Sequence, residues 1–452
     1  MSSRLSAMRE QNSDLAKTLR PVDAVTIVVG NVVGVGIFTT TGFIAGDVPD
    51  ARLIMAAWLL GGFLTLLGAL SYGELGAAFP QAGGDYVYLR EAYGPLAGFL
   101  VGWVGFFIIN PASIATLALG STEYLLPIVV PNPAALPNIV PKSIAVFLIL
   151  VFTVINALSV RWASLTQNIV CGLNLLIILL LLGAGFIWGS GDWIHFGFTS
   201  LQNTWGDLFG PAMVSVFFTY SGWFVSAYVA GEMQDAPRTL PLSLIVSSII
   251  VTVLYLLMNV FYIYALPIPE MKGVVDVARR ASESLLGSRI SILVAVMVLF
   301  AILGSLNSVI LTAPRIYYAM ARDGLFPKVL GTVHNRRRTP CHSIAVQGVL
   351  SCAMVQTGTF YQLLSYSVFF MILSSIATGV GLFVLRFRNP ALQRPYKAWG
   401  YPFTPLIFVA SYTWIAVRVF VHNPTNALVG ILITLTGIPF FFYWMLRKQR
   451  NK

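Results

Sequence analysis

The stretch Gly30-Asn-Val-Val-Gly34-Val-Gly36-Ile-Phe38 decides the fold. It lies inside the first long apolar segment, about 22–46, and Thr39-Thr40-Thr41-Gly42 follows it. Glycine costs about 1 kcal/mol relative to alanine inside a helix, so three glycines favour a break. One alternative is a helix-packing seam, in which Gly34 pairs with the first glycine of the stretch. Gly34 and Gly36 lie on different faces of a helix, so one seam does not account for both.

The composition is that of an integral membrane protein. Of 452 residues, 57% are hydrophobic and 10% are charged, whereas soluble domains carry about 25% charged residues. Twelve apolar stretches are long enough to cross about 30 Å of hydrocarbon as helices. The predicted spans are 22–46, 53–75, 95–126, 142–158, 165–188, 208–231, 240–266, 290–320, 342–358, 360–387, 403–421 and 426–446.

Charge predicts the orientation. Most of the 28 Lys and Arg residues fall on one side if the N-terminus is cytoplasmic, which predicts that both termini are cytoplasmic. The positive charge then gives no indication of nucleic-acid binding. The polar tail 1–20 precedes an apolar stretch too long for a signal peptide, so we expect no cleaved leader. The three cysteines, Cys171, Cys341 and Cys352, lie in or beside predicted helices, which argues against a disulfide framework.

Ionisable residues avoid the predicted helix centres. The acids that come closest to the membrane core are Asp23, Glu74, Glu123, Glu232 and Asp235. The four histidines also lie in loops or at helix ends. Membrane enzymes need a nucleophile, an acid–base pair or a metal cluster within the bundle. We therefore expect neither an enzyme nor a bound metal or other cofactor.

A second polar break is predicted at Phe217-Phe-Thr-Tyr-Ser-Gly222-Trp223. Gly36 and Gly222 are 186 positions apart, and each begins a block of five predicted helices. Five is odd, so the second block enters the membrane from the opposite side, as in an inverted repeat with a site at the bilayer midplane. The predicted division is a tail at 1–20, a first repeat at 21–188, a second repeat at 189–390, and two further helices with a cytoplasmic tail at 391–452.

The two breaks predict a zwitterionic ligand. Unpaired N–H groups in lipid cost several kcal/mol each unless a partner accepts from them. A half-helix starting near Thr39 would direct its positive end toward an anion, while carbonyls freed at the second break would attract a cation. An α-amino acid meets both needs. With no Asp, Glu, Lys or Arg near the breaks, neutral side chains fit best.

Several further segments resemble one family. They are the run Gly73–Gly94 (GELGAAFPQAGGDYVYLREAYG), Asn110-Pro-Ala-Ser113, Asn156-Ala-Leu-Ser159-Val and Arg394-Pro-Tyr-Lys397. From about Leu19 to the C-terminus, the chain is similar to the amino acid–polyamine–organocation (APC) superfamily and, within it, to the L-type amino acid transporters. The resemblance implies an all-α integral membrane fold with 12 transmembrane helices, in which a LeuT-like 5+5 inverted-repeat core is followed by two C-terminal helices.

The resemblance also implies site residues. The backbone N–H groups that hold the substrate carboxylate are those of Gly34, Val35 and Gly36. The backbone carbonyls that receive its ammonium are those of Val32, Phe218, Thr219 and Ser221. The residues expected to gate or line the pocket are Phe218, Asn31, Tyr220 and Asn110. Ser221 narrows the side-chain pocket, which favours small or medium substrates.

The sequence leaves several modes of transport coupling open. Asn174 stands where many relatives carry a lysine that contacts the first helix, so no ammonium can titrate there. Asn174 can bond the freed helix 1 backbone or simply a neighbouring helix. Sodium-independent exchange or facilitated diffusion is the leading hypothesis. The alternatives are proton symport through Glu74 or Glu123, a weak Na⁺ site at Ser305, Asn307 and Ser308, and transport of a related amine or polyamine.

The outer loop 127–141 holds no cysteine to link a glycoprotein subunit, as the eukaryotic L-type members do. No Asn-x-Ser/Thr acceptor site with x other than Pro occurs. We expect a stand-alone transporter of a prokaryotic inner membrane, as a monomer or a weak homodimer. Two smaller expectations are a short amphipathic helix within 274–289 and a pair between Glu74 and Arg90, either an inner gate or a solvated loop contact.

Overall fold

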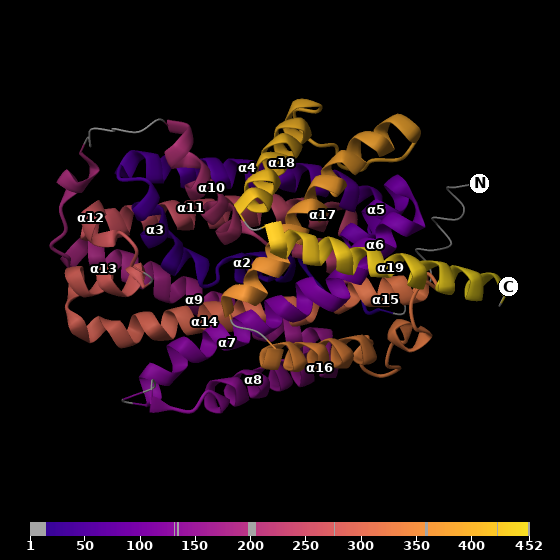
Figure 1. Cartoon of the computed structure of the whole chain (residues 1–452), viewed down its shortest axis with the longest axis horizontal. Helices are drawn as coiled ribbons and strands as arrows, with labels where there is room; N and C mark the ends of the chain where they lie inside the picture. Colours follow the sequence, from indigo (N-terminus) through magenta and orange to yellow (C-terminus); the bar gives the residue numbers. More distant parts are fainter. Residues whose placement is uncertain are drawn as a thin grey trace.

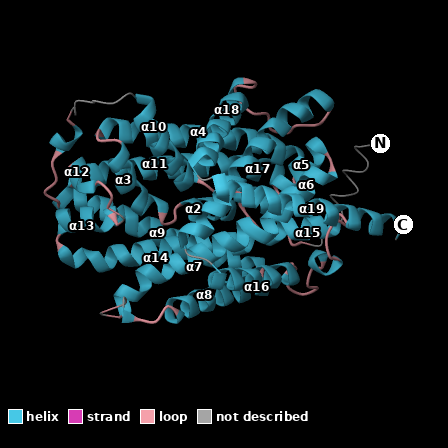
Figure 2. Cartoon of the chain, in the orientation of Figure 1, coloured by secondary structure: helices cyan, strands magenta, loops and turns pink. Residues whose placement is uncertain are grey.

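The computed structural model describes residues 15–130, 132, 135–197, 205–274, 276–357, 360–422 and 424–450. Helices make up this part of the chain, and no strand occurs within it (Figure 2). The α-helices are α2 (Pro21–Val32), α3 (Gly36–Asp47), α4 (Ala51–Ala78), α5 (Asp85–Tyr93), α6 (Pro95–Val104), α7 (Asn110–Val129), α8 (Ile139–Leu158), α9 (Val160–Trp188), α10 (Trp205–Tyr220), α11 (Ala236–Ala265), α12 (Ile268–Met271), α13 (Val277–Leu286), α14 (Ser291–Thr312), α15 (Pro314–Arg322), α16 (Cys341–Thr357), α17 (Phe360–Arg388), α18 (Phe403–His422) and α19 (Pro424–Arg450).

Long apolar helices confirm the membrane fold. Within the described residues, ten helices are long and apolar enough to cross a membrane, and α2 with α3 makes an eleventh span. The predicted span 342–358 corresponds to α16, whose 17 residues extend about 26 Å at 1.5 Å per residue. That is shorter than the roughly 30 Å of hydrocarbon. Twelve spans and their division into two repeats stay predictions.

The first predicted break is confirmed. α2 ends at Val32 and α3 begins at Gly36, and the two half-helices meet at 40°. The second half-helix therefore starts three residues earlier than Thr39, where the sequence suggested it. Gly36 explains the early start, because a Cβ built on it would lie 2.8 Å from Cγ2 of Thr219. Only a residue without a side chain lets α3 begin this close to α10.

The second predicted break is also confirmed. α10 ends at Tyr220, a turn covers 221–224, and the chain continues as the 3₁₀ helix η4 (Val225–Glu232). Gly222 has φ +85°, a backbone conformation that costs little only for glycine. A third irregularity is the π-helical turn η1 (Gly105–Ile109) between α6 and α7. Such turns free a backbone carbonyl and occur often at functional sites.

The broken helix α2 lies at the centre of the bundle. It packs against α9, α11 and α14, while α11 also packs along α4. α18 contacts α4 and α17, and α19 contacts α6 and α17 on the outside of the molecule (Figure 1). The first break therefore lies among α9, α11 and α14.

The two chain ends lie at the same end of the bundle. The amide of Leu19 donates to the carbonyl of Glu232 at 2.9 Å, and the Glu232 carboxylate pairs with Arg315 of α15. Just beyond α15, the carbonyl of Asp323 accepts a hydrogen bond of 2.6 Å from Lys448 of α19. These contacts join both ends of the described chain to α15.

The amphipathic helix expected within 274–289 is α13. Its apolar residues Ala278, Ala281 and Leu285 are buried, and it packs against α9, α11 and α14. Its polar face carries Arg279, which bonds the Glu283 carboxylate one turn later at 2.8 Å. The helix lies flat across the ends of longer helices, since one face is apolar and the other charged.

Candidate functional site

The two helix breaks lie against each other. Gly36 of α3 contacts the side chain of Thr219 of α10. One helical turn after Gly36, the hydroxyl of Thr40 lies 2.8 Å from the hydroxyl of Thr219. At the other end of the break, Asn31 donates from Nδ2 to the carbonyl of Gly222 at 3.1 Å. The structure thus brings together the two polar stretches that the sequence places 186 positions apart.

Tyr255 of α11 ties the two breaks to each other. Its hydroxyl lies 2.7 Å from the Val32 carbonyl and 3.2 Å from the Thr219 carbonyl. The ring is fully buried and packs edge-on against Trp58 of α4. Sequence reasoning missed this residue, because a lone tyrosine in an apolar helix reads as core. The one indication was its hydroxyl, which needs a partner when buried.

The backbone amides at the first break are partly free. Gly34 donates to the carbonyl of Val32 at 2.8 Å. Val35 and Gly36 donate to no acceptor among the described residues. They stand at the N-terminus of α3, where the helix dipole is positive and anions are stabilised. The arrangement can hold a carboxylate by main-chain groups alone.

Three of the four predicted carbonyls already accept hydrogen bonds. Those of Val32 and Thr219 receive the Tyr255 hydroxyl, and that of Phe218 receives the Ser221 amide at 3.0 Å. A carbonyl oxygen has two lone pairs, so those of Phe218 and Thr219 each keep one acceptor position for a ligand. The Val32 carbonyl already accepts from both the Gly34 amide and the Tyr255 hydroxyl, and gains a free position only when Gly34 releases it. The Ser221 side chain lines a cavity of about 20 Å³ beside α17, together with Phe218.

A second cavity opens on the other side of the breaks. It has a volume of about 50 Å³, enough for several water molecules, and Asn31, Gly222 and Asn110 line it together with Asp85. Sequence reasoning placed Asp85 in a connecting loop and expected no carboxylate near the breaks. That expectation was wrong, because the chain turns inward at Gly83 and Gly84, whose φ values are +121° and +51°.

Asp85 is held in place by hydroxyl groups. It is 2% exposed and accepts from Tyr228 of η4 at 3.1 Å and from Thr378 of α17 at 2.9 Å. Burial raises the pKa of this carboxyl, and neighbouring hydroxyls, with that of Tyr72 foremost, act in the opposite direction. The Tyr72 and Ser374 hydroxyls interact with it at a poorer geometry than the two hydrogen bonds. A carboxylate thus faces the interior with hydroxyl partners.

Two predicted pocket residues have structural partners. Asn110 donates from its side chain to the Gly105 carbonyl at 2.8 Å, which also accepts the Asn110 backbone amide within the π-helical turn. Its amide also lies 2.9 Å from the Tyr317 hydroxyl. Tyr220 points toward α4, where its hydroxyl donates to the Trp58 carbonyl at 3.0 Å. Asn110 still borders the cavity, whereas Tyr220 lines neither cavity described above.

On α9, Gln167 and Asn168 contact α2, and Asn168 bonds the side chains of Thr26 and Asp23. Gln167 also reaches α14. Its Nε2 donates to the Thr26 carbonyl at 3.3 Å, and its Oε1 accepts from Asn307 of α14 at 2.8 Å. Asn174 is buried, and its Oδ1 has no hydrogen-bond partner in the described part of the chain. The residue expected to bond the break is therefore not bonded to it here, while Gln167 braces the helix before the break.

Hydroxyls of α14 occupy carbonyls of α2. Ser305 lies 3.0 Å from the carbonyls of both Gly30 and Asn31, and Ser308 lies 2.9 Å from that of Ile27. A serine hydroxyl must be the donor in each contact, because a carbonyl can only accept. No cluster of three or more His, Cys, Asp or Glu that could hold a metal occurs among the described residues.

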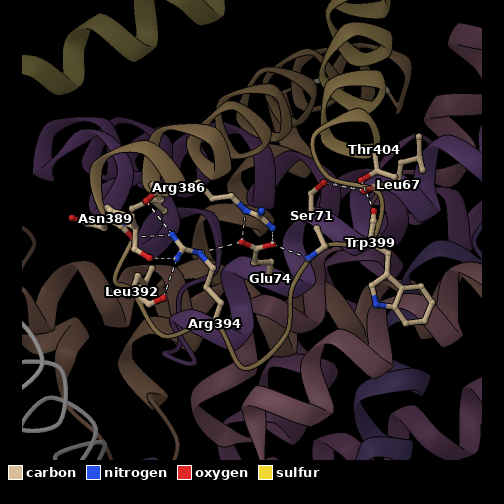
Figure 3. Close-up of polar contacts among 12 residues, drawn as sticks. Leu67, Ser71, Glu74, Arg386, Asn389, Leu392, Arg394, Trp399 and Thr404 are labelled. Atoms are coloured by element: carbon tan, nitrogen blue, oxygen red, sulfur yellow. Dashed lines mark hydrogen bonds and ion pairs between the residues drawn. The ribbon is translucent and has the colours of Figure 1, made fainter.

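Glu74 does not pair with Arg90, so that expectation was wrong. Its carboxylate binds Arg386 at 2.9 Å, Arg394 at 3.2 Å and the amide of Ala398 at 2.7 Å (Figure 3). Arg386 lies in the last turn of α17, and the segment after α17 brings Arg394 and the Ala398 amide to the same carboxylate. Arg90 instead pairs with Asp323.

The comparisons with known proteins agree with this architecture. The family model described as amino acid permease matches residues 19–446. The Asc-type amino acid transporter 1 of Mus musculus is 33% identical over 97% of this chain and 83% of its own length. The large neutral amino acids transporter small subunit 2 of Homo sapiens is 32% identical over 95% of this chain and 81% of its own.

A third relative is named for different amino acids. The cystine/glutamate transporter of Homo sapiens is 29% identical over 98% of this chain and 88% of its own length. Together with the family match, which covers nearly the whole chain, these similarities confirm the resemblance seen in the sequence motifs. They also agree with a transporter rather than an enzyme. The chain belongs to the amino acid permease family of the APC superfamily and is a multi-pass membrane transporter.

Proposed function

We propose that this protein transports neutral L-α-amino acids by alternating access around the two helix breaks, through sodium-independent exchange or facilitated diffusion. The observation that carries the proposal is the pair of amides at Val35 and Gly36, which have no acceptor among the described residues and lie where α3 packs against Thr219 at the break of α10. Main-chain donors at a helix N-terminus suit a carboxylate. Carbonyls across the same gap suit an ammonium.

The proposed roles follow from this geometry. The carboxylate binds the amides of Val35 and Gly36 first, and Gly34 joins when it releases the Val32 carbonyl. That release also frees an acceptor for the ammonium, so one ligand exchanges an internal hydrogen bond for two of its own. The remaining acceptors are the carbonyls of Phe218, Thr219 and Ser221. Phe218, half-buried at the end of α10, closes over the bound substrate.

A neutral side chain is supported by the relative whose name specifies large neutral amino acids. Ser221 beside Phe218 reduces the room available, so small and medium substrates are favoured. Asp85 lies in the adjoining cavity, but its carboxylate is engaged by two hydroxyl donors. Uptake of alanine, serine and leucine by proteoliposomes tests the size preference, and a clear preference for leucine would refute it.

Sodium independence is supported by α14. In a sodium site, carbonyl and hydroxyl oxygens would all direct lone pairs at the cation. Here the hydroxyls of Ser305 and Ser308 donate to the α2 carbonyls instead. Hydroxyl protons of α14 therefore link it to the carbonyls of α2.

We further propose a location and an assembly. The protein resides in a prokaryotic inner membrane with both termini in the cytoplasm, as the distribution of Lys and Arg predicts. It acts as a monomer or a weak homodimer, without a disulfide-linked subunit. Crosslinking in membranes, followed by mass analysis of the intact protein, tests the assembly. A covalent partner released by reductant would contradict it.

Counterflow in proteoliposomes tests the function. Vesicles loaded with an unlabelled amino acid are diluted into labelled amino acid, with each of the twenty as a candidate and with or without sodium and proton gradients. We expect accumulation driven by neutral amino acids and unchanged by sodium. Exchange driven by amines alone, with no amino acid active, would exclude the proposed carboxylate site.

A further inference from the structure

Asp85 differs from the two buried glutamates of the described chain. Glu74 is paired with two arginines, and Glu232 is paired with Arg315. Within the described residues, no Lys or Arg forms an ion pair with Asp85. Its partners are neutral hydroxyls, so the cost of burying its charge is only partly offset. A carboxylate in this position exchanges a proton more readily than one locked to arginine.

Asp85 also joins elements on both sides of the cavity. Tyr228 belongs to η4, the continuation of broken α10, and Thr378 belongs to α17. Gly84 fits the junction closely, since a Cβ on it would lie 2.1 Å from the Tyr228 ring. A path that widens this cavity must separate η4 from α17. Widening it would therefore break at least one of the two hydrogen bonds and admit water to the carboxylate.

Charged groups on the elements around Asp85 have other partners. Arg90 of α5 pairs with Asp323, which follows α15. On α17, Arg386 pairs with Glu74, and Arg388 donates to the Ala92 carbonyl at 3.2 Å.

The titratable neighbours that remain are tyrosines: Tyr72 of α4, Tyr88 of α5 and Tyr228 of η4. α6 carries no titratable side chain. Tyrosines are neutral across the physiological range. Glu91 of α5 pairs with Arg90, and Glu232 of η4 pairs with Arg315. Asp85 is therefore the carboxylate among the residues that line this cavity.

We propose that Asp85 is a proton-binding site at which a proton holds this side of the cavity closed, so that acidification slows transport. This inference rests on the proposed function, because its transport assays require that the protein exchanges amino acids. It adds a proton as a ligand of the carrier, bound reversibly by the carboxylate.

The direction follows from linkage. In the closed arrangement burial raises the pKa of Asp85, whereas in an open arrangement water returns it toward the ordinary value of about 3.9. The proton therefore binds more tightly to the closed state, and a ligand shifts a population toward the state it binds better. As pH falls through the raised pKa, the closed population grows and the opening step becomes rarer.

The first test is exchange of a neutral amino acid in proteoliposomes from about pH 4 to 8, a range that extends from ordinary carboxyl values to those of buried carboxyls. We expect the wild-type rate to fall on acidification. Asp85→Asn, which cannot titrate, should give a flat profile. Glu283→Gln, which replaces a half-buried carboxylate of α13 that pairs with Arg279, is the matched control and should keep the wild-type profile. A wild-type profile in Asp85→Asn would overturn the inference.

A second pair of variants keeps the inference testable if Asp85→Asn fails to fold. The Thr378 hydroxyl favours the ionised carboxylate, so Thr378→Val should shift the midpoint of the profile to higher pH. Thr378→Ser retains the hydroxyl and should restore the wild-type midpoint. Equal midpoints in the valine and serine variants would count against the inference.

A readout without transport separates this inference from the proposed function. Infrared difference spectra of the purified protein, recorded between acid and neutral pH, should contain a protonated carboxyl band that Thr378→Val moves to higher pH. Absence of that shift would refute the proton site even if transport is normal. A shifting band in a protein that exchanges no amino acid would refute the proposed function alone.

Discussion

At Gly36, the missing side chain allows two broken helices to meet. A Cβ there would lie within 3.1 Å of three atoms of Thr219, closer than packed carbon atoms approach. Gly34 is similarly confined, with the Ser305 hydroxyl 3.0 Å from its virtual Cβ. These glycines therefore serve close approach of the main chain to a neighbour, as well as unwinding.

Gly36→Ala should weaken substrate binding. Overpacking costs about 1–3 kcal/mol, and 1.4 kcal/mol is tenfold in affinity, so we expect an affinity for alanine reduced about tenfold. Gly172→Ala is the matched control, because nothing lies within 4 Å of its virtual Cβ. Isothermal titration of both purified variants measures the difference. Equal affinities would show that the break of α3 does not form the site.

Tyr255→Phe should impair transport with little loss of packing. The substitution leaves the Val32 and Thr219 carbonyls without their shared donor, and an unsatisfied buried polar group costs about 1–3 kcal/mol. We expect a melting temperature lowered by a few degrees and slower exchange. Tyr443→Phe, at an exposed position of α19, should change neither quantity. Normal exchange in Tyr255→Phe would show that the hydroxyl bridge is dispensable.

At the scale of elements, sequence patterns located both breaks but not what surrounds them. Glycine beside polar residues in an apolar helix is visible locally, so the breaks at α2–α3 and α10–η4 could be predicted. The predicted start of α3 was three residues too late, because the actual start depends on contact with Thr219 of a distant helix. Tyr255 was missed for the same reason, because its role exists only where α11 passes both breaks.

A buried ion pair joins η4 to α15, and breaking it should destabilise the protein. Glu232 and Arg315 are fully buried, with N···O distances of 2.8 and 3.0 Å. Removing one partner of a buried pair costs about 3–5 kcal/mol, while replacing both by apolar residues is often neutral. We expect Glu232→Met to unfold at a clearly lower temperature than the double variant Glu232→Met/Arg315→Met.

Thermal unfolding in detergent, followed by circular dichroism, makes this comparison. The two single variants and the double variant form a cycle that isolates the coupling between the side chains. Equal destabilisation by Glu232→Met and by the double variant would mean that the pair contributes no coupling across η4 and α15.

At the scale of the whole molecule, composition was enough to predict a membrane protein and the position of most of its helices. Hydrophobic length and charge asymmetry report directly on the bilayer. The inward turn at Gly83 and Gly84 was not visible, because a positive φ leaves no mark in composition. For this reason Asp85 was assigned to a loop, and the arginine partners of Glu74, about 310 positions away along the chain, could not be inferred.

The predicted topology can be measured by cysteine labelling. In a variant without native cysteines, Ser190→Cys lies in the exposed connection between α9 and α10, and Asn335→Cys lies in the exposed connection between α15 and α16. We expect an impermeant maleimide to label Ser190→Cys on intact cells, and to label Asn335→Cys only after permeabilisation. The reverse pattern would invert the orientation.

The central claim is that the main chain at two facing helix breaks binds a zwitterion, and competition in counterflow tests it most directly. Labelled alanine exchange is challenged with unlabelled alanine, with propionate, which lacks the ammonium, and with ethylamine, which lacks the carboxylate. The account predicts that alanine alone competes at low concentration, since each half of the site needs its own charge. Competition by propionate or ethylamine as strong as that by alanine would contradict it.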